Sequence, residues 1–248
     1  MDAATLTARI SQPINEFGAW FMLDPATFAR SVEAGMSTGW ASHTQGRIGV
    51  MGDVDVEVAV ANMLFFDPDY IRANWNAPMT ISKAEAGVAY AAICVDRGRL
   101  YLAGYNGAAR LAELLEKVVD AADDTDADLF AGWRDAARPD DAEGRAYLLV
   151  ATMRELRGCR HMATCRAAGA DAETMTLAKS GLAWAGIHGF RNLHADPTPP
   201  EVVADIEAAT DAADAGNFTC LTDDERTELV DLVEAAVAHA KATGLNPA

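Results

Sequence analysis

The sequence predicts a mainly α-helical protein built as a multi-helix bundle, and three observations support this. Half of the 248 residues are apolar but only 7% are aromatic, and the abundant alanine favours helices because it loses no side-chain entropy there. Three capping boxes, in which a hydroxyl residue stands three positions before a glutamate, are expected at Ser82–Glu85, Thr198–Glu201 and Thr222–Glu225. Helical spacing is also clear in one apolar series: Leu111, Leu114, Leu115, Val118 and Val119.

In the first third of the chain, Asp24 and Pro25 predict a helix start, with Asp24 as N-cap and the helix covering about residues 25–34. Residues 53–60 alternate polar and apolar side chains, which suits a strand, but the apolar continuation suits a buried helix equally well. A helix should follow Ser82 as far as about residue 94. Residues 96–98 then form either the turn of a hairpin or part of a helix, and we favour the helix.

In the second half, one long helix is expected over about residues 142–168, ending at Gly169, and another over about 172–184. Thr198 should cap the next helix, with Pro199 at its first position, and Gly216 should close it in the left-handed conformation. The last helix should follow Thr222 and end at Gly244. An acidic loop at 120–128 suggests two helical halves, 1–122 and 129–248, although one compact domain also fits the length.

The charge of the chain argues against nucleic acid as a partner. The formal net charge is -17 and the isoelectric point is about 4.5, whereas affinity for nucleic acid comes largely from Lys and Arg placed on phosphates. The best basic clusters are short: one is Arg97 with Arg99, and the other, which Glu155 interrupts, lies on one predicted helix and consists of Arg154, Arg157, Arg160 and Arg166. An acidic surface also disfavours anionic membranes, and no apolar run reaches the roughly 18 residues of a membrane span.

The start of the chain lacks the basic and apolar regions of a signal peptide, and the four cysteines do not form a disulfide framework. We therefore expect reduced thiols and a cytoplasmic location. Apolar surfaces on the Leu- and Ala-rich helices could support a homodimer, although nothing in the sequence demands one.

The chain contains no P-loop, GxGxxG, HExxH, GxSxG or CxxC motif, and the sequence names no cofactor. Thiolate and imidazole ligands suit zinc, and Cys159, His161 and Cys165 lie close together in the sequence. A third or fourth ligand would have to come from His188 or His194, so we favour a buried cysteine and a hydrogen-bonded histidine, and we expect no metal.

Two sets of polar residues stand on predicted helices. Arg154 and Arg157 lie mid-helix beside apolar residues and could form either a solvated face or a pocket wall that binds a polar or anionic ligand. Glu207 and Asp211 are four residues apart and should share a helix face. Such paired carboxylates can perform acid–base chemistry or simply meet arginines.

Several segments, in order, resemble the SalK-like actinobacterial family. They are GRIGVMGDV at 46–54, FFDP at 65–68, LFAG at 129–132, RELRGCRH at 154–161 and IEAATD at 206–211. The resemblance implies a largely helical fold with a winged helix-turn-helix unit and the label of transcriptional regulator. The chain departs from the pattern between Gly169 and Ile206, where the recognition helix and wing should stand. That segment is shorter and carries Trp184, His188, Phe190 and His194 in place of a basic recognition surface, so a degenerate winged-helix-like unit that has lost DNA readout is expected.

The residues that match the polar positions of the family come from three distant segments: Arg47, Arg154, Glu155, Arg157, His161, Glu207 and Asp211. If they converge, they make a concave polar site, to which Phe66, Trp184 and His188 would add aromatic surface. This hypothesis predicts that Arg47 or Arg154 contacts His161 or Glu207.

The leading functional hypothesis is a small-molecule-binding protein on a regulator-like scaffold. The first alternative is an enzyme in which His161 is the general acid or base, Glu207 orients it, and Arg47 or Arg154 holds an anionic substrate. The second alternative is a transcriptional regulator.

Overall fold

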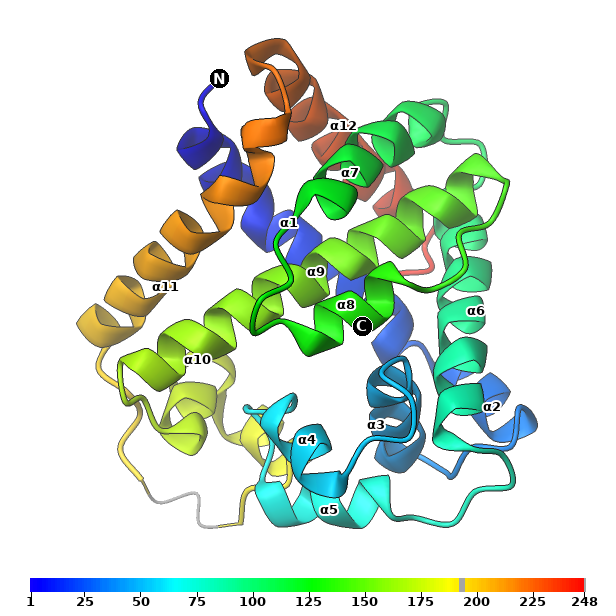
Figure 1. Ribbon diagram of the computed structural model, residues 1–248, viewed down its shortest axis with the longest axis vertical. Helices are drawn as coiled ribbons and strands as arrows, with labels where there is room; N and C mark the ends of the chain where they lie inside the picture. The colour runs from blue at the N-terminus through cyan, green and yellow to red at the C-terminus, as the bar shows by residue number, and fades with distance from the viewer. Residues whose placement is uncertain (192–194, 248) are drawn as a thin grey trace.

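The computed structural model describes residues 1–191 and 195–247, and within these ranges every regular element is a helix. Figure 1 shows the arrangement. The helices are α1 (Ala3–Leu23), α2 (Pro25–Glu33), α3 (Trp40–Gly49), α4 (Val56–Ala61), α5 (Pro68–Trp75), α6 (Lys83–Tyr101), α7 (Ala108–Ala121), α8 (Asp128–Arg134), α9 (Ala142–Ala167), α10 (Ala172–Ile187), α11 (Pro200–Ala215), the 3-10 helix η1 (Gly216–Cys220) and α12 (Asp223–Ala242). The mainly α prediction is confirmed.

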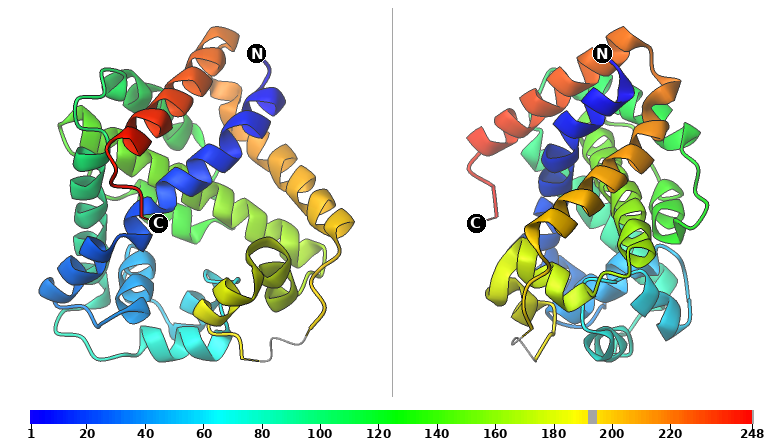
Figure 2. Two further views of the ribbon diagram at one scale, coloured as in Figure 1. Left: turned by 180° about the vertical axis from the view of Figure 1, so that it is seen from behind. Right: turned by 90° about the vertical axis from the view of Figure 1, so that its left-hand side faces the viewer.

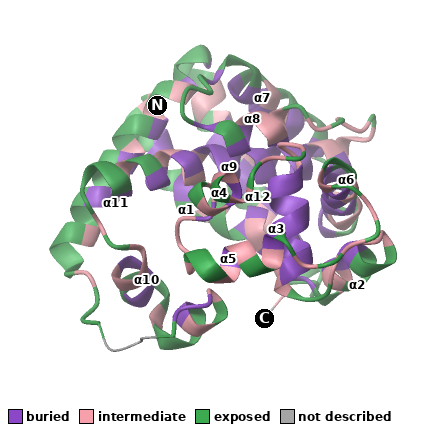
Figure 3. Ribbon diagram, turned by 60° about the horizontal axis from the view of Figure 1, so that its bottom comes forward, coloured by how far each residue is buried: buried purple, intermediate pink, exposed green. Residues whose placement is uncertain are grey.

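Helix α9 is the centre of the fold. It crosses the middle of the molecule and packs against α1, α6, α7, α8 and α11. Seen from behind, α1 crosses α9, and α12 packs against α1 and α7 (Figure 2). Buried residues concentrate along α9 and on the sides of the neighbouring helices that face it, whereas α11 is largely exposed (Figure 3). A 26-residue helix buried along most of its length thus provides the axis on which polar side chains from other helices can meet.

The tyrosine Tyr147 of α9 fixes this helix to α1. Its hydroxyl donates to the carbonyl of Phe17 at 2.8 Å and accepts the amide N–H of Phe21 at 3.1 Å. The amide of Phe21 and the carbonyl of Phe17 stand four residues apart in α1, so the hydroxyl bridges one turn of α1 and links it to α9. Such fully satisfied buried polar groups stabilise one particular packing of a core.

Most of the local predictions are confirmed. Asp24 caps α2 by accepting from the N–H of Ala26, and the capping boxes at Ser82–Glu85 and Thr222–Glu225 have their side-chain and backbone hydrogen bonds. The apolar series of α7 is buried, and α9 ends just before Gly169. Residues 56–61 form a helix rather than the alternative strand. Helix α6 continues without interruption to Tyr101, so the alternative hairpin around residues 96–98 does not form.

Three expectations about the second half are wrong. Pro199, not Thr198, occupies the N-cap of α11, because Pro200 is equally compatible with the first helical position. The capping box expected at Thr198–Glu201 therefore does not form, and the Thr198 hydroxyl donates instead to the hydroxyl of Thr174. Gly216 is right-handed and leads directly into η1, and α10 extends to Ile187 with a break at Gly181.

Residues 1–191 and 195–247 contain no β-strand, so no β-hairpin wing exists within them. None of the helices in these ranges is both long and apolar enough to span a bilayer.

Candidate ligand-binding site

A cavity of about 1060 Å³ lies between α1, α9, α10 and α11, close to the end of the chain. Apolar side chains line one part of it, among them Trp20 of α1 and Trp184 of α10. Charged side chains line another part: Arg157, His161, Lys179, Glu207 and Asp211. A volume in the range of small-molecule sites, with mixed aromatic and polar walls, is typical of a ligand pocket.

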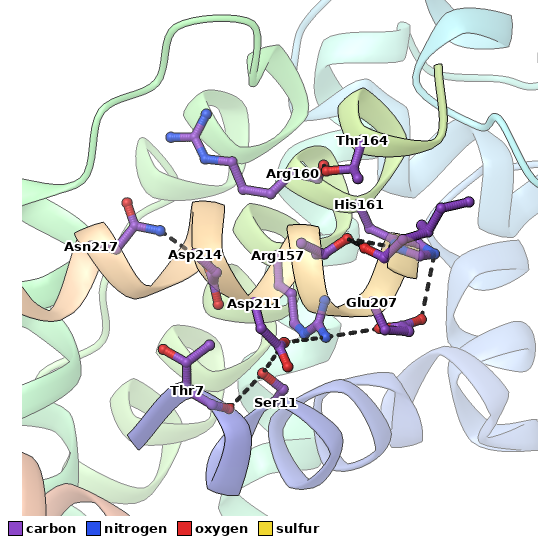
Figure 4. Close-up of polar contacts among 12 residues, drawn as sticks. Thr7, Ser11, Arg157, Arg160, His161, Thr164, Glu207, Asp211, Asp214 and Asn217 are labelled. Carbon is purple, nitrogen blue, oxygen red and sulfur yellow. Dashed lines mark hydrogen bonds and ion pairs between the residues drawn. The ribbon is translucent and has the colours of Figure 1, made fainter. Parts of the chain in front are cut away.

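Helical spacing explains why four of these side chains meet. Arg157 and His161 are one turn apart on α9, and Glu207 and Asp211 are one turn apart on α11. Because α9 and α11 pack against each other, the two faces oppose one another. Arg157 Nη2 donates to Glu207 Oε2 at 3.0 Å and to Asp211 Oδ1 at 2.8 Å (Figure 4).

Two further helices complete this network. The hydroxyl of Ser11 on α1 donates to Asp211 Oδ1 at 3.2 Å, and Lys179 on α10 forms an ion pair with Glu207. The break at Gly181, where φ is +77°, redirects α10 just after Lys179. As a result, Lys179 and Trp184 of the same helix both line the cavity. We did not expect Lys179 or Trp20 from the sequence, because neither stands in a recognisable motif.

His161 is held as a neutral ring with a defined proton position. The Thr210 hydroxyl donates to the carbonyl of Ile206 at 2.7 Å, so its oxygen accepts from His161 Nδ1, which lies 3.1 Å away. Nε2 then carries the lone pair and lies 3.8 Å from Glu207 Oε1 and 3.8 Å from the Cys165 sulfur. Burial, together with the charge of Lys179, lowers the pKa of His161 to about 4. The ring can therefore accept a proton or a hydrogen bond at Nε2, and it cannot serve as a charged acid at neutral pH.

A second polar cluster, which we call the interior triad, consists of Arg47, Glu155 and Arg154. Arg47 binds Glu155 through two hydrogen bonds, Nη2–Oε2 at 2.7 Å and Nε–Oε1 at 3.2 Å. Arg154 Nη1 donates to Glu155 Oε1 at 2.8 Å. The Glu155 side chain is 0% exposed. Burial by itself would raise the pKa of this carboxyl, but the two arginines outweigh burial and hold it below its ordinary value.

The predicted convergence is therefore wrong in its central detail. Within the described residues, neither Arg47 nor Arg154 forms an ion pair or hydrogen bond with His161 or Glu207. The arginines meet Glu155, which stands one turn before Cys159 on α9, while the cavity collects Arg157, His161, Glu207 and Asp211. The residues proposed from the sequence thus divide into two groups along one helix.

The aromatic residues connect the two groups. Trp184 lines the cavity and packs edge-on against His188, with ring centroids 5.9 Å apart. The His188 ring stacks on Phe66 at 4.1 Å, and its Nδ1 donates to the carbonyl of Phe65 at 2.7 Å. Phe65 in turn stacks on His161. His43, which the sequence analysis did not single out, lies on α3 one turn before Arg47 and hydrogen-bonds to the Tyr90 hydroxyl at 2.9 Å. Its four-residue spacing from Arg47 is the feature of the sequence that could have indicated it.

Cys159, His161 and Cys165 do not gather into one cluster. Cys165 approaches His161, but the described residues contain no group of three or more His, Cys, Asp or Glu placed to hold a metal ion. His194 lies outside the described residues.

Asp214 continues the acidic face of α11 and provides a pH-dependent prediction. Burial raises its pKa to about 6, above the value of roughly 3.9 for an unfolded aspartate. The folded state therefore retains the proton longer, so this stabilisation is complete below about pH 4 and is lost as the pH rises through about 6. Asp214→Asn should raise the free energy of unfolding at pH 7 by about 2–3 kcal/mol relative to the natural protein.

Urea unfolding at pH 4 and pH 7 measures this effect. The advantage of Asp214→Asn should shrink towards zero at pH 4, where the natural carboxyl is neutral in the folded state and about half protonated in the unfolded state. An equal advantage at both pH values would contradict the assignment.

A family model described as "helix-turn-helix family" matches residues 7–191, about three quarters of the chain. The chain belongs to this helix-turn-helix family. Searches of curated proteins and of solved structures gave no match. In this helix-turn-helix family member, the matched region includes the interior triad, Arg157 and His161, whereas Glu207 and Asp211 follow it.

The arginines of this helix-turn-helix family member are committed to internal partners. Arg97 pairs with Asp24, and Arg99 pairs with Asp96 and Asp141. The remaining members of the basic clusters bind as follows: Arg154 to Glu155, Arg157 to Glu207 and Asp211, Arg160 to the carbonyls of Asp123 and Thr125, and Arg166 to the carbonyl of Ala61. Guanidinium groups engaged in this way are less available to DNA phosphates.

Proposed function

We propose that this protein binds a small molecule in the cavity between α1, α9, α10 and α11, and that its helix-turn-helix scaffold has lost DNA readout. The observation that carries this proposal is the cavity itself: about 1060 Å³ with two tryptophans and an ordered charged network in its walls. The network is fixed before any ligand arrives, because Arg157 is held by two carboxylates and Asp211 also accepts from Ser11. Preorganised polar groups reduce the entropic cost of binding.

The distribution of charge supports the loss of DNA readout. Helix α10 contains one cation, Lys179, and Glu207 neutralises it. The surface of α10 is instead apolar, with Leu182, Trp184 and Ile187 exposed. A helix that enters a DNA groove needs donors for base edges and cations for phosphates. We also infer that the chain belongs to the SalK-like branch of helix-turn-helix proteins, from the order of its matching segments.

Native mass spectrometry and tryptophan fluorescence test the proposal. Protein purified from its source cells should carry a small molecule that is released on unfolding. Adding that molecule back to stripped protein should change the emission of Trp20 and Trp184. Trp184→Ala should weaken binding at least tenfold, since a buried aromatic contact is lost.

Leu182→Ala is the matched control, because Leu182 lies on the same helix and is exposed but does not line the cavity. Equal binding by the two variants would place the ligand elsewhere. Salt-sensitive retardation of upstream DNA in a gel would support a regulator instead.

His161 supports a second candidate function, an enzyme that uses it as a general base. Its neutral ring presents the Nε2 lone pair beside the cavity, while Thr210 holds Nδ1. This is the arrangement of an oriented base, in which one ring nitrogen is fixed by a neighbour and the other faces the reacting group. His161→Gln should then abolish turnover of the bound molecule while its affinity changes little. If the molecule is never converted by the natural protein, the binding function stands alone.

A further inference from the structure

The imidazole of His161 brings one free acceptor to the wall of the cavity between α1, α9, α10 and α11. Its side chain is only 10% exposed. Nδ1 donates to the hydroxyl of Thr210 at 3.1 Å, and the ring stacks on Phe65 with the centroids 5.3 Å apart. These two contacts hold the ring in one plane and one tautomer. The nitrogen that remains for a ligand is therefore Nε2, which carries a lone pair and no proton.

Nε2 has no strong donor among the described residues. The Cys165 sulfur and Glu207 Oε1 approach it, each at 3.8 Å. Burial raises the pKa of Cys165, so the thiol keeps its proton, but a thiol is a weak donor. Although burial opposes it, the hydrogen bond from Lys179 holds the pKa of Glu207 below its ordinary value, so this carboxylate has no proton to give. A buried acceptor of this kind is best satisfied by a donor on the ligand.

The cavity is open beside His161. Gly158 stands three residues before it on the same face of α9 and also lines the cavity. A Cβ at position 158 would meet no atom within 4 Å. Trp184 of α10 lines the same cavity and is 37% exposed. A ligand thus has room next to the acceptor and an aromatic face in the same cavity on which to pack.

The charges around the cavity favour an uncharged ligand. Positive and negative side chains are equal in number among the described residues that line it: Arg157, Lys179 and Lys241 against Glu16, Glu207 and Asp211. Burial lowers the pKa of His161 to about 4, so its ring adds no charge at pH 7. An ionic ligand would lose its hydration without gaining a net counter-charge. An aliphatic amine is protonated at pH 7, whereas a phenolic hydroxyl, which titrates near about 10, is neutral and can donate.

We propose that the cavity binds an uncharged aromatic molecule with a hydroxyl group, which donates to His161 Nε2 while the ring packs on Trp184. The hydroxyl supplies the strong donor that the chain itself does not give this nitrogen. The inference rests on the proposed function and deepens it, because it names the class of molecule that the cavity takes.

The test compares β-naphthol with its methyl ether, which keeps the rings and the oxygen but has no proton to donate. Equilibrium dialysis at pH 7 and constant ionic strength measures both affinities in the natural protein. β-Naphthol should bind about tenfold or more tightly than the ether, because the ether leaves Nε2 buried and unpaired. The anionic analogue β-naphthoate should bind more weakly than β-naphthol.

Three variants separate the donor contact from the cavity itself. His161→Leu should remove the preference for β-naphthol over the ether, since leucine has no acceptor. Cys165→Ala is the matched control: it removes the thiol beside Nε2 but keeps the acceptor, so the preference should persist. Gly158→Leu fills the open space beside His161 and should weaken the binding of both probes together.

Several outcomes would overturn the inference. They are equal binding of β-naphthol and the ether, no binding of β-naphthol, tighter binding of β-naphthoate, an unchanged preference in His161→Leu, or a loss of preference in Cys165→Ala as complete as in His161→Leu. The comparison within the natural protein decides the question even if His161→Leu does not fold. A cellular ligand whose affinity depends on Trp184 and Gly158 but not on His161 would leave the proposed function standing and remove this inference alone.

Discussion

Replacing Glu155 by glutamine is expected to lower the free energy of unfolding by about 3–5 kcal/mol, because it leaves two arginines in the interior without a counter-charge. Glu155 accepts two hydrogen bonds from Arg47 and one from Arg154, and its side chain has no exposed surface. Glutamine has the same shape but only one acceptor oxygen, so at least one guanidinium contact is lost along with the charge. Urea unfolding followed by circular dichroism measures the change.

Glu207→Gln is the matched control. Glu207 also contacts two cations, Arg157 and Lys179, but its side chain is 30% exposed and Arg157 keeps Asp211 as a partner. Water can solvate the cations that this variant releases, so a loss of about 1 kcal/mol or less is expected. Similar losses for the two variants would mean that burial of the triad does not determine its contribution.

Replacing Gly87 by alanine should destabilise the protein by about 3 kcal/mol or prevent folding. Gly87 of α6 crosses Gly49 of α3, and a Cβ at position 87 would lie 2.2 Å from the carbonyl carbon of Gly49 and 2.3 Å from its oxygen. The obstacle is backbone rather than a flexible side chain, so the two helices must separate. Overpacking of this kind typically costs 1–3 kcal/mol and more where nothing can yield.

Gly158→Ala tests the same substitution without the clash. Gly158 lies within α9, and a Cβ there would meet no atom within 4 Å. Alanine should stabilise this helix by about 0.5–1 kcal/mol, because it restricts the unfolded chain and has the higher helix propensity. Thermal unfolding of the two variants should give shifts of opposite sign. A loss of stability in both would show that the close approach of α3 and α6 is not the cause.

Moving α3 away from α6 would also affect the interior triad. Arg47 lies two residues before Gly49 on α3, and Tyr90, which hydrogen-bonds to His43, lies one turn after Gly87 on α6. The glycine crossing therefore positions the arginine that binds Glu155.

Features that depend on residues a few positions apart could be predicted from the sequence. Asp24 before Pro25, the Ser82–Glu85 and Thr222–Glu225 capping boxes, and the apolar series of α7 all specify their own helices, since each interaction closes within one or two turns. The errors at the start of α11 and at Gly216 are equally local, since each concerns only neighbouring residues. At Thr198–Pro200 either of two consecutive prolines can occupy the first helical position, so the start of the helix can shift by one residue. Gly216 could adopt the left-handed conformation, but nothing required it to, and it is right-handed.

The pairing of charges was decided by tertiary structure. The sequence showed that Arg154, Glu155, Arg157 and His161 stand on one helix and that Glu207 and Asp211 share a face of another. It could not show that α3 brings Arg47 to Glu155 while α11 brings Glu207 and Asp211 to Arg157. An ion pair forms wherever helix packing brings opposite charges together, and that packing is set by contacts between residues far apart in the sequence, such as Arg47 and Glu155 at a separation of 108 residues. The sequence by itself determined a helical scaffold and its caps; only the packing of α3, α10 and α11 around α9 decided that the polar residues form a cavity network and a separate triad of Arg47, Glu155 and Arg154.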